Sequence, residues 1–204
     1  MPADFGNQSY WRERFTHETQ FEWLLPSADF MAMLQPHLDR LDPSSARILH
    51  LGSGTSDLAT HLRGRGFLDV LNVDYEPLAA ERGRDLERRA FGDVRMRYAV
   101  ADATQLGSGS DGVDPRARFD LVVDKSTVDA VSCAGGEALA RMARGVRQRL
   151  ADGAAWISLS YSSRRFDDVE HLPFDVEVIA RVPTPKLSPA DPDVYHCCYL
   201  MTPK

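Results

Sequence analysis

The sequence is poor in the features that mark secreted, membrane-spanning and nucleic-acid-binding proteins. Its 204 residues include only three cysteines, Cys133, Cys197 and Cys198, which cannot build a disulfide framework and suit a reducing compartment. No apolar run approaches the roughly 18 residues that a membrane span requires, and the first residues lack the basic and apolar regions of a signal peptide. The net charge of −6 lacks the basic footprint of a nucleic-acid binder. We therefore expect a cytoplasmic protein without membrane or nucleic-acid partners.

Apolar runs and helical patterns alternate along the chain, which is typical of a mostly parallel sheet flanked by helices. The runs predict strands over 47–51, 70–74, 95–100, 119–123 and 155–160, with helices over 56–63, 77–89 and 137–150 between them. Two further strand-like runs, 174–182 and 194–201, have no helix between them and must pair antiparallel. The length predicts a single α/β domain, 1–204, with a seven-stranded sheet and helices on both faces.

The predicted domain has three parts. Residues 1–46 are rich in aromatics and are expected to form a cover and a helix, which Ser27 would cap and Pro36 would end or kink. Residues 47–160 form the ligand-binding core, and residues 161–204 form the antiparallel strands. The stretch 107–114, rich in Gly, Ser and Asp, predicts a mobile surface loop.

A glycine turn, Gly52-Ser53-Gly54, follows the first predicted strand, where it lets a ligand approach the backbone closely. Asp74 ends the next strand, 22 residues beyond Gly52, and a carboxylate at this place can accept both ribose hydroxyls of an adenosine. Asp102 ends the third strand and is expected to accept the exocyclic amine of adenine, with the Ala103 amide facing the ring. Because the carboxyl ends of these strands meet in one crevice, they predict an adenosine site.

The residue three positions after Gly54 distinguishes between adenosine cofactors. A dinucleotide fingerprint has a glycine there, whereas this chain has Asp57, whose charge would repel a pyrophosphate. S-adenosylmethionine carries no phosphate and has a cationic amino group, so it is compatible with an acid near the turn. With the terminal antiparallel pair, this predicts a Rossmann-like class I methyltransferase fold with S-adenosylmethionine as cofactor. The six histidines show no metal-ligand spacing, so no metal is expected.

Five short segments carry a family resemblance: Tyr10-Trp11 with Phe15, Glu22-Trp23, Ile48 to Gly54, Asn72 to Tyr75, and Asp124 through Ala130. Together they resemble the small methyltransferases related to the lysine methyltransferases of eukaryotic translation elongation factor 1A. That group has the pattern acid-Lys-Gly-Thr-Leu-Asp-Ala in the last segment, from which Ser126 and Val128 depart. His50 stands where most class I enzymes have an acid, and the elongation-factor group lacks this acid too.

The resemblance also implies how the cofactor is held. Trp11, Phe15 and Trp23 would fold over it, and its pocket would be lined by Gly52, Asp74, Tyr75, Asp102, Ala103 and Lys125. On physical grounds, aromatic rings can supply apolar cover and cation–π attraction to a sulfonium. The alternatives are that Trp11 and Trp23 pack against the sheet edge and that Lys125 is solvated.

A protein lysine is the acceptor that the resemblance implies, on an elongation-factor-like substrate. A lysine loses its proton before attack and needs no strong internal base, so we assign none. Glu22, Asp124 and Asp129 are the acids expected to orient an amine, and Asp124 has the strongest claim to a catalytic role because it follows the strand that faces the methyl group. A small-molecule acceptor for N-, O- or S-methylation is the alternative. The intact glycine turn and strand-end acids disfavour a catalytically silent adenosine-binding module.

Overall fold

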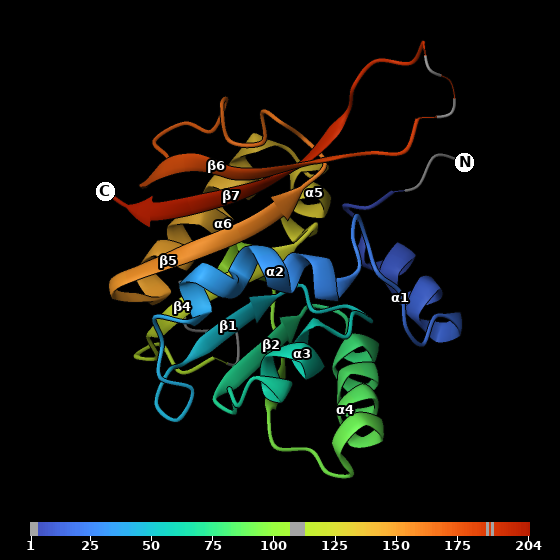
Figure 1. Ribbon diagram of the computed structural model, residues 1–204, viewed down its shortest axis with the longest axis vertical. Coiled ribbons are helices and arrows are strands. Elements are labelled where there is room, and N and C mark those ends of the chain that lie inside the picture. Colours follow the sequence, from blue (N-terminus) through green and yellow to red (C-terminus); the bar gives the residue numbers. More distant parts are fainter. Residues whose placement is uncertain (1–3, 107–112, 187, 189) are drawn as a thin grey trace.

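A seven-stranded sheet in the order β3-β2-β1-β4-β5-β7-β6 forms the centre of the molecule (Figure 1). The computed structural model describes residues 4–106, 113–186, 188 and 190–204. Its strands are β1 Ile48–Leu51, β2 Val70–Asp74, β3 Arg97–Val100, β4 Phe119–Lys125, β5 Leu150–Ser160, β6 Phe174–Pro183 and β7 Tyr195–Pro203. Strands β1 to β5 pair in parallel, whereas β7 pairs antiparallel with both β5 and β6. The predicted mostly parallel sheet with a C-terminal antiparallel pair is confirmed.

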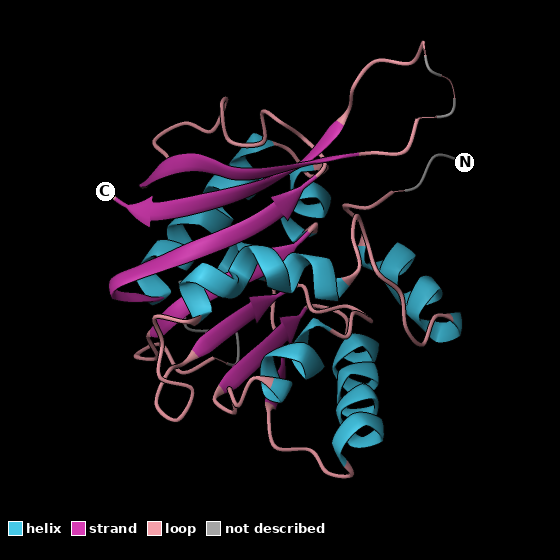
Figure 2. Ribbon diagram, viewed as in Figure 1, coloured by secondary structure: helices cyan, strands magenta, loops and turns pink. Residues whose placement is uncertain are grey.

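Helices cover both faces of this sheet (Figure 2). They are α1 Gln8–His17, α2 Ser27–Leu38, α3 Leu58–Gly64, α4 Pro77–Phe91, α5 Thr127–Ser132 and α6 Gly136–Arg149, with a short 3₁₀ helix, η1, over Ala103–Gln105. On one face, α2 and α3 contribute Phe30, Leu34 and Leu58 to a core with β1 and β4. On the other face, α6 contributes Leu139 and Met142. Strands β1 and β2 are buried at every position, as expected where parallel strands are covered on both sides.

Most predicted elements are found close to their predicted boundaries. Helix α4 begins at Pro77 and ends at Phe91, and its cap residue Gly92 has a φ of +82°, in the left-handed region. Strand β5 begins at Leu150, earlier than predicted, because α6 ends at Arg149 and the chain passes directly into the strand. Helices α1 and α5 are additional elements that no sequence pattern predicted. Helix α1 buries only Phe15, and α5 has only 6 residues.

One prediction about α2 was wrong. Ser27 does not cap the helix, because Pro26 occupies the cap position and the Ser27 hydroxyl donates to Glu22 Oε2 at 2.8 Å. Pro36, predicted to end or kink the helix, lies in its last turn, and the helix ends two residues later at Leu38. The predicted loop at 107–114 lies mostly outside the described residues.

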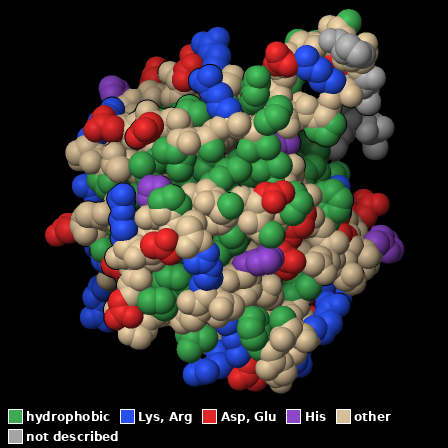
Figure 3. Space-filling model, viewed as in Figure 1, with side chains coloured by type: hydrophobic (Ala, Val, Ile, Leu, Met, Phe, Trp, Pro, Cys, Tyr) green, Lys and Arg blue, Asp and Glu red, His purple; other side chains and the backbone are tan. Residues whose placement is uncertain are grey.

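No helix in the described part of the chain has both the length and the apolar character to cross a membrane. Figure 3 shows apolar side chains gathered over the strands β5 to β7, beside α2. Ile179, Ala180 and Leu200 are partly buried and pack against the core that α2 shares. A pocket lies elsewhere, at the carboxyl ends of the parallel strands.

Candidate active site

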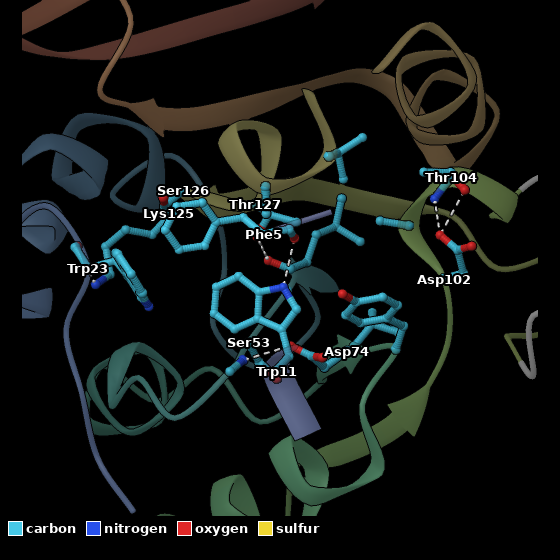
Figure 4. A pocket seen from close by; sticks show the side chains of 18 of the residues that line it. Phe5, Trp11, Trp23, Ser53, Asp74, Asp102, Thr104, Lys125, Ser126 and Thr127 are labelled. Atoms are coloured by element: carbon cyan, nitrogen blue, oxygen red, sulfur yellow. Dashed lines mark hydrogen bonds between the residues drawn. The ribbon is translucent and has the colours of Figure 1, made fainter. Parts of the chain in front are cut away.

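A pocket at the carboxyl ends of β1, β2 and β4 collects every cofactor-binding residue that the sequence predicted (Figure 4). These residues are Trp11, Phe15, Trp23, Gly52, Ser53, Gly54, Asp74, Tyr75, Asp102, Ala103 and Lys125. The pocket also has walls that sequence reasoning missed. Phe5 and Phe21 come from the N-terminal segment, and Ala134, Ala138 and Arg141 come from α6 and the turn before it.

The glycine turn after β1 is too crowded for any other residue at its first position. Gly52 and Gly54 have φ values of +58° and +51°, which non-glycine residues rarely adopt. A Cβ atom on Gly52 would lie 2.1 Å from Thr127 Oγ1, and this hydroxyl donates to Leu51 O at 2.8 Å. The turn therefore presents bare backbone to the pocket, as the sequence predicted.

Asp74 ties the glycine turn to the end of β2. Its Oδ2 accepts a hydrogen bond from Gly54 N at 3.0 Å and its Oδ1 accepts one from Glu76 N at 2.9 Å. Only 8% of the residue is exposed. This burial raises the pKa of the carboxyl to about 6, although the two amides oppose the shift. The carboxylate lies on the pocket wall, where a ribose could reach its remaining acceptor positions.

Asp102 lies on the pocket wall after β3. Its Oδ1 accepts hydrogen bonds from Thr104 N and Thr104 Oγ1, both at 2.8 Å, so it caps the short helix η1. Its Oδ2 accepts one from Gln105 Nε2 at 2.9 Å. Burial, with Asp74 and Asp102 nearby, raises the pKa of the Tyr75 phenol on the same wall. Tyr75 therefore stays protonated and offers a neutral ring to this part of the pocket.

Aromatic side chains from the N-terminal segment cover the pocket. Phe15 is buried and lies directly over the turn, since a Cβ on Gly54 would be 3.7 Å from its Cζ. The Trp11 ring centroid is 5.6 Å from that of Phe15 and 5.9 Å from that of Trp23. Trp11 Nε1 donates to Phe5 O at 2.8 Å. These side chains form a continuous cluster of rings on the pocket wall.

Lys125 anchors this cover. Its side chain is 3% exposed, and its ammonium is in a salt bridge with Glu22. The ammonium also donates to the carbonyl oxygens of Trp23 at 3.1 Å and Leu25 at 3.2 Å. Burial lowers the pKa of Lys125, and the Glu22 charge opposes that shift. Lys125 lines the pocket with its carbon stem while its charged end holds the segment that carries Trp23.

Glu22 fills the amino end of the helix that follows the glycine turn. Its Oε1 accepts a hydrogen bond from Asp57 N at 2.8 Å, and its Oε2 accepts one from Ser56 Oγ at 3.1 Å. A bound pyrophosphate would need backbone amides such as Asp57 N, and the Glu22 carboxylate that already accepts from this amide would repel the phosphates. From the sequence alone, the exclusion of a pyrophosphate was attributed to the side chain of Asp57, which does not line the pocket. The site fits an adenosine cofactor without phosphate.

The structure does not place Asp124 on the pocket wall, contrary to its predicted catalytic position. Its side chain is fully buried, with Oδ2 accepting from Trp156 Nε1 at 2.8 Å and Oδ1 from Val128 N at 3.2 Å. Burial raises its pKa to about 7. Asp129 is also engaged, in an ion pair with Arg165 at 2.8 Å. Glu22, Asp124 and Asp129 therefore all have partners within the protein.

His50, which replaces the usual acid of the first motif, is a buried neutral side chain. Its Nδ1 lies 2.9 Å from Asn72 Oδ1 on the neighbouring strand. Burial lowers its pKa to about 4, so it carries no charge beneath the turn at neutral pH. Among the described residues, no group of three or more His, Cys, Asp or Glu side chains could hold a metal ion.

Comparison with known proteins adds to this geometry. No family model matches the chain. Over all 204 residues it is 58% identical to methyltransferase srdJ of Neurospora crassa, covering 86% of that protein. The chain belongs to the class I S-adenosylmethionine-dependent methyltransferases. S-adenosylmethionine is accordingly its cofactor.

The predicted resemblance to the elongation-factor group is confirmed. This methyltransferase is 29% identical over 170 residues to EEF1A lysine methyltransferase 4 of Mus musculus, which covers 77% of this chain and 62% of that protein. It is 30% identical over 130 residues to the eEF1A lysine and N-terminal methyltransferase homolog of Drosophila melanogaster, and the match covers only 18% of that protein.

Solved structures confirm the fold. Magnesium protoporphyrin IX methyltransferase from Synechocystis, solved with bound SAM, superposes with a TM-score of 0.66 at 9% identity, over 95% of this chain and 94% of that one. N-methyltransferase NodS from Bradyrhizobium japonicum, solved with S-adenosyl-L-homocysteine, superposes with a TM-score of 0.57 at 16% identity, over 94% and 98%. At these identities the likeness supports the Rossmann-like class I architecture alone.

Proposed function

We propose that the chain methylates a small, uncharged acceptor, using S-adenosylmethionine bound across the pocket. The cofactor supplies an electrophilic methyl group on a sulfonium. Asp74 would accept the ribose hydroxyls, and Asp102 with Ala103 would recognise the adenine. Gly52-Ser53-Gly54 gives the cofactor a close backbone approach. Lys125 holds the segment that carries Trp23.

The aromatic cover has two tasks in this proposal. Trp11, Phe15 and Trp23 exclude water from the reacting centre, and their ring faces attract the sulfonium by cation–π interaction. The chain's contribution to rate would then be alignment of acceptor and methyl group, with no general base assigned.

The charge of the pocket wall is the observation that carries the acceptor class. Among the described residues that line the pocket, carboxylates come only from Asp74 and Asp102, at the end that would hold adenosine. The acids that sequence reasoning expected to orient an amine are elsewhere engaged: Glu22 pairs with Lys125, Asp124 bonds to Trp156, and Asp129 pairs with Arg165. An acceptor that arrives as an ammonium ion would find no free acid to hold it.

A protein lysine is the second candidate acceptor. It is favoured by the relatives at 27–30% identity, whose names give eEF1A lysine methylation as their activity.

The free state of Cys133, Cys197 and Cys198 supports a reducing, cytoplasmic setting for either acceptor. The net charge of −6 supports the absence of a nucleic-acid partner. For a small-molecule acceptor and for a protein lysine alike, we propose that residues 1–204 act as one methyltransferase domain.

Two experiments test the proposal. Isothermal titration with S-adenosylhomocysteine should show binding to the wild type and little binding to Asp74→Ala; no heat from the wild type would overturn the cofactor site. Incubation with methyl-labelled cofactor and a fungal extract then separates the acceptors. Label that passes a small-pore filter supports a small acceptor, and label retained on a protein of elongation-factor size supports lysine.

A further inference from the structure

Phe5 occupies the middle of the pocket's aromatic cluster, although no sequence pattern singled it out. Its ring centroid lies 5.2 Å from that of Tyr10, 6.0 Å from Trp11 and 5.7 Å from Trp23. Two of these contacts, with Tyr10 and Trp23, are edge-to-face, the arrangement that aromatic rings favour. We call Tyr10, Trp11 and Trp23 the aromatic box; Figure 4 shows Phe5 together with Trp11 and Trp23 in the pocket.

The walls of the box are fixed without the Phe5 ring. Tyr10 contacts Trp11 at 5.2 Å and Trp11 contacts Trp23 at 5.9 Å. Arg14 Nη1 donates to the Tyr10 hydroxyl at 3.2 Å, and its guanidinium lies 4.6 Å from the centre of the Trp23 ring. The Trp23 carbonyl is held by the Lys125 ammonium. The box would therefore keep its shape if the ring inside it moved away.

The Phe5 ring is held by packing alone. The side chain is half-buried, and the hydrogen bond at this residue runs from Trp11 Nε1 to the backbone carbonyl of Phe5, not to its ring. Asn7 N donates to Asp4 O at 3.1 Å and closes the turn around Phe5, so the ring can leave by rotation of its side chain while the backbone stays in place. Another aromatic ring could therefore take the place of the Phe5 ring and make the same contacts with the walls of the box.

The electrostatics of the box favour a neutral occupant. The Arg14 guanidinium lies 4.6 Å from the centre of the Trp23 ring and pairs with Glu18 at 2.6 Å, and none of the three walls carries a carboxylate. Aromatic faces attract cations, but the Trp23 ring already has the Arg14 cation against it, so an ammonium in the box would meet a like charge without a carboxylate of its own. An uncharged ring would keep the contacts that Phe5 now makes.

We propose that the aromatic box is the acceptor subsite, that it takes an uncharged aromatic ring, and that Phe5 is an intramolecular stand-in for that ring. The inference deepens the proposed function and depends on it, since the acceptor is taken to be a small molecule. Acceptor binding then requires the Phe5 side chain to leave the box, and this side chain acts as a plug that the acceptor displaces.

The test uses 2-naphthol as a neutral aromatic probe and benzylamine as a cationic one, titrated into the full chain saturated with S-adenosylhomocysteine. Phe5→Ala vacates the box and should bind 2-naphthol about tenfold more tightly than the wild type, the scale of one or two aromatic contacts. Phe91→Ala, a matched ring removal on the exposed surface of α4, should leave the affinity unchanged. Benzylamine should bind at least tenfold more weakly than 2-naphthol to Phe5→Ala.

Tyr10→Leu provides a second variant, which removes a wall and should weaken 2-naphthol binding while S-adenosylhomocysteine still binds. Equal 2-naphthol affinity in the wild type and Phe5→Ala, or equal binding of benzylamine, would overturn the inference. Titration of the same samples with S-adenosylhomocysteine distinguishes the cofactor site from the aromatic subsite. If S-adenosylhomocysteine does not bind, the cofactor site is refuted. If S-adenosylhomocysteine binds but the probe does not, only the aromatic subsite is refuted.

Discussion

Asp74 shows how one buried carboxyl links affinity to pH. Its pKa is raised to about 6 by burial, and only the ionised form can accept two ribose hydroxyls. Because the raised pKa favours the protonated form as pH falls, affinity should be complete well above pH 6 and lost as the pH drops through 6. Titration with S-adenosylhomocysteine at pH 5 should therefore give about tenfold weaker binding than at pH 8, since roughly nine-tenths of the groups are then protonated.

Asp74→Asn is the control for this pH effect. It should bind weakly with the same affinity at both values, because its amide does not titrate. A wild-type affinity that is equal at pH 5 and pH 8 would contradict the role given to this carboxyl.

Gly52 shows how little space the turn leaves. Gly52→Ala adds a Cβ 2.1 Å from Thr127 Oγ1 at a φ of +58°, so strain and overlap act together. Urea unfolding should show a loss of about 3 kcal/mol. Gly92→Ala has a φ of +82° and no atom within 4 Å of the added Cβ, so it should lose only about 1 kcal/mol. Equal losses in the two variants would show that Thr127 does not crowd the turn.

At the scale of elements, the N-terminal segment is bonded to the core at two strand ends. Residues 18–22 reach the turn after β1, where Glu18 Oε1 accepts from Thr55 Oγ1 at 2.7 Å and Phe21 N donates to Thr55 O at 3.2 Å. The end of β4 holds the same segment through Lys125 and Glu22. The N-terminal segment is therefore bonded directly to the cofactor turn.

Lys125→Met tests this connection. It leaves Glu22 without its cation in a site where Lys125 is 3% exposed, so the free energy of unfolding should fall by about 3 kcal/mol. Trypsin should also cut at Arg12 and Arg14 faster than in the wild type. The double variant Glu22→Gln/Lys125→Met should lose less, because no unpaired charge remains.

Arg88→Met is the matched control, since its pair with Asp85 is 57% and 47% exposed. It should change stability by less than about 0.5 kcal/mol. If Lys125→Met were as mild as Arg88→Met and equally resistant to trypsin, Lys125 would not anchor the cover.

At the scale of the whole molecule, ligand binding should appear as thermal stability. S-adenosylhomocysteine at a hundred times its Kd should stabilise the folded state by about 2.7 kcal/mol. For a chain of this size, that corresponds to a rise in Tm of roughly 5–10 °C in a calorimetric scan. Asp74→Ala should show a much smaller rise at the same ligand concentration, and an equal rise would contradict the assigned site.

The sheet and the cofactor turn were predictable because they depend on short, continuous patterns. Strands such as β2 are short and mostly apolar, and the strand-end residues Gly52, Asp74 and Asp102 follow from parallel pairing. The orientation of side chains at the end of β4 was harder to predict. Successive residues of a strand point to opposite faces, so Lys125 shares the face of Val123 with α2, while Asp124 shares the face of Val122 with Trp156. This alternation, not proximity in sequence, separates the pocket residue from its buried neighbour.

Contacts between distant segments were the part that the sequence could not provide. Helix α1 is polar along most of its length, and its helical form depends on packing against the turn and α4. Likewise, Glu22 lies 103 positions from Lys125, and no local pattern pairs them. Phe5 was missed for the same reason, since its aromatic partners become neighbours only when the segment folds over the core.

The dual use of Glu22 has a consequence for anyone who redesigns this enzyme. A chimera that exchanged residues 1–46 for those of a relative, in order to import a new acceptor preference, would also exchange one partner of Lys125 and the group that satisfies the Asp57 amide. If the aromatic box is the acceptor subsite, as proposed, residues 1–46 carry determinants of both acceptor choice and cofactor retention. Grafts that keep a carboxylate at position 22 should tolerate new box residues, whereas grafts that lose it would need a compensating change at position 125.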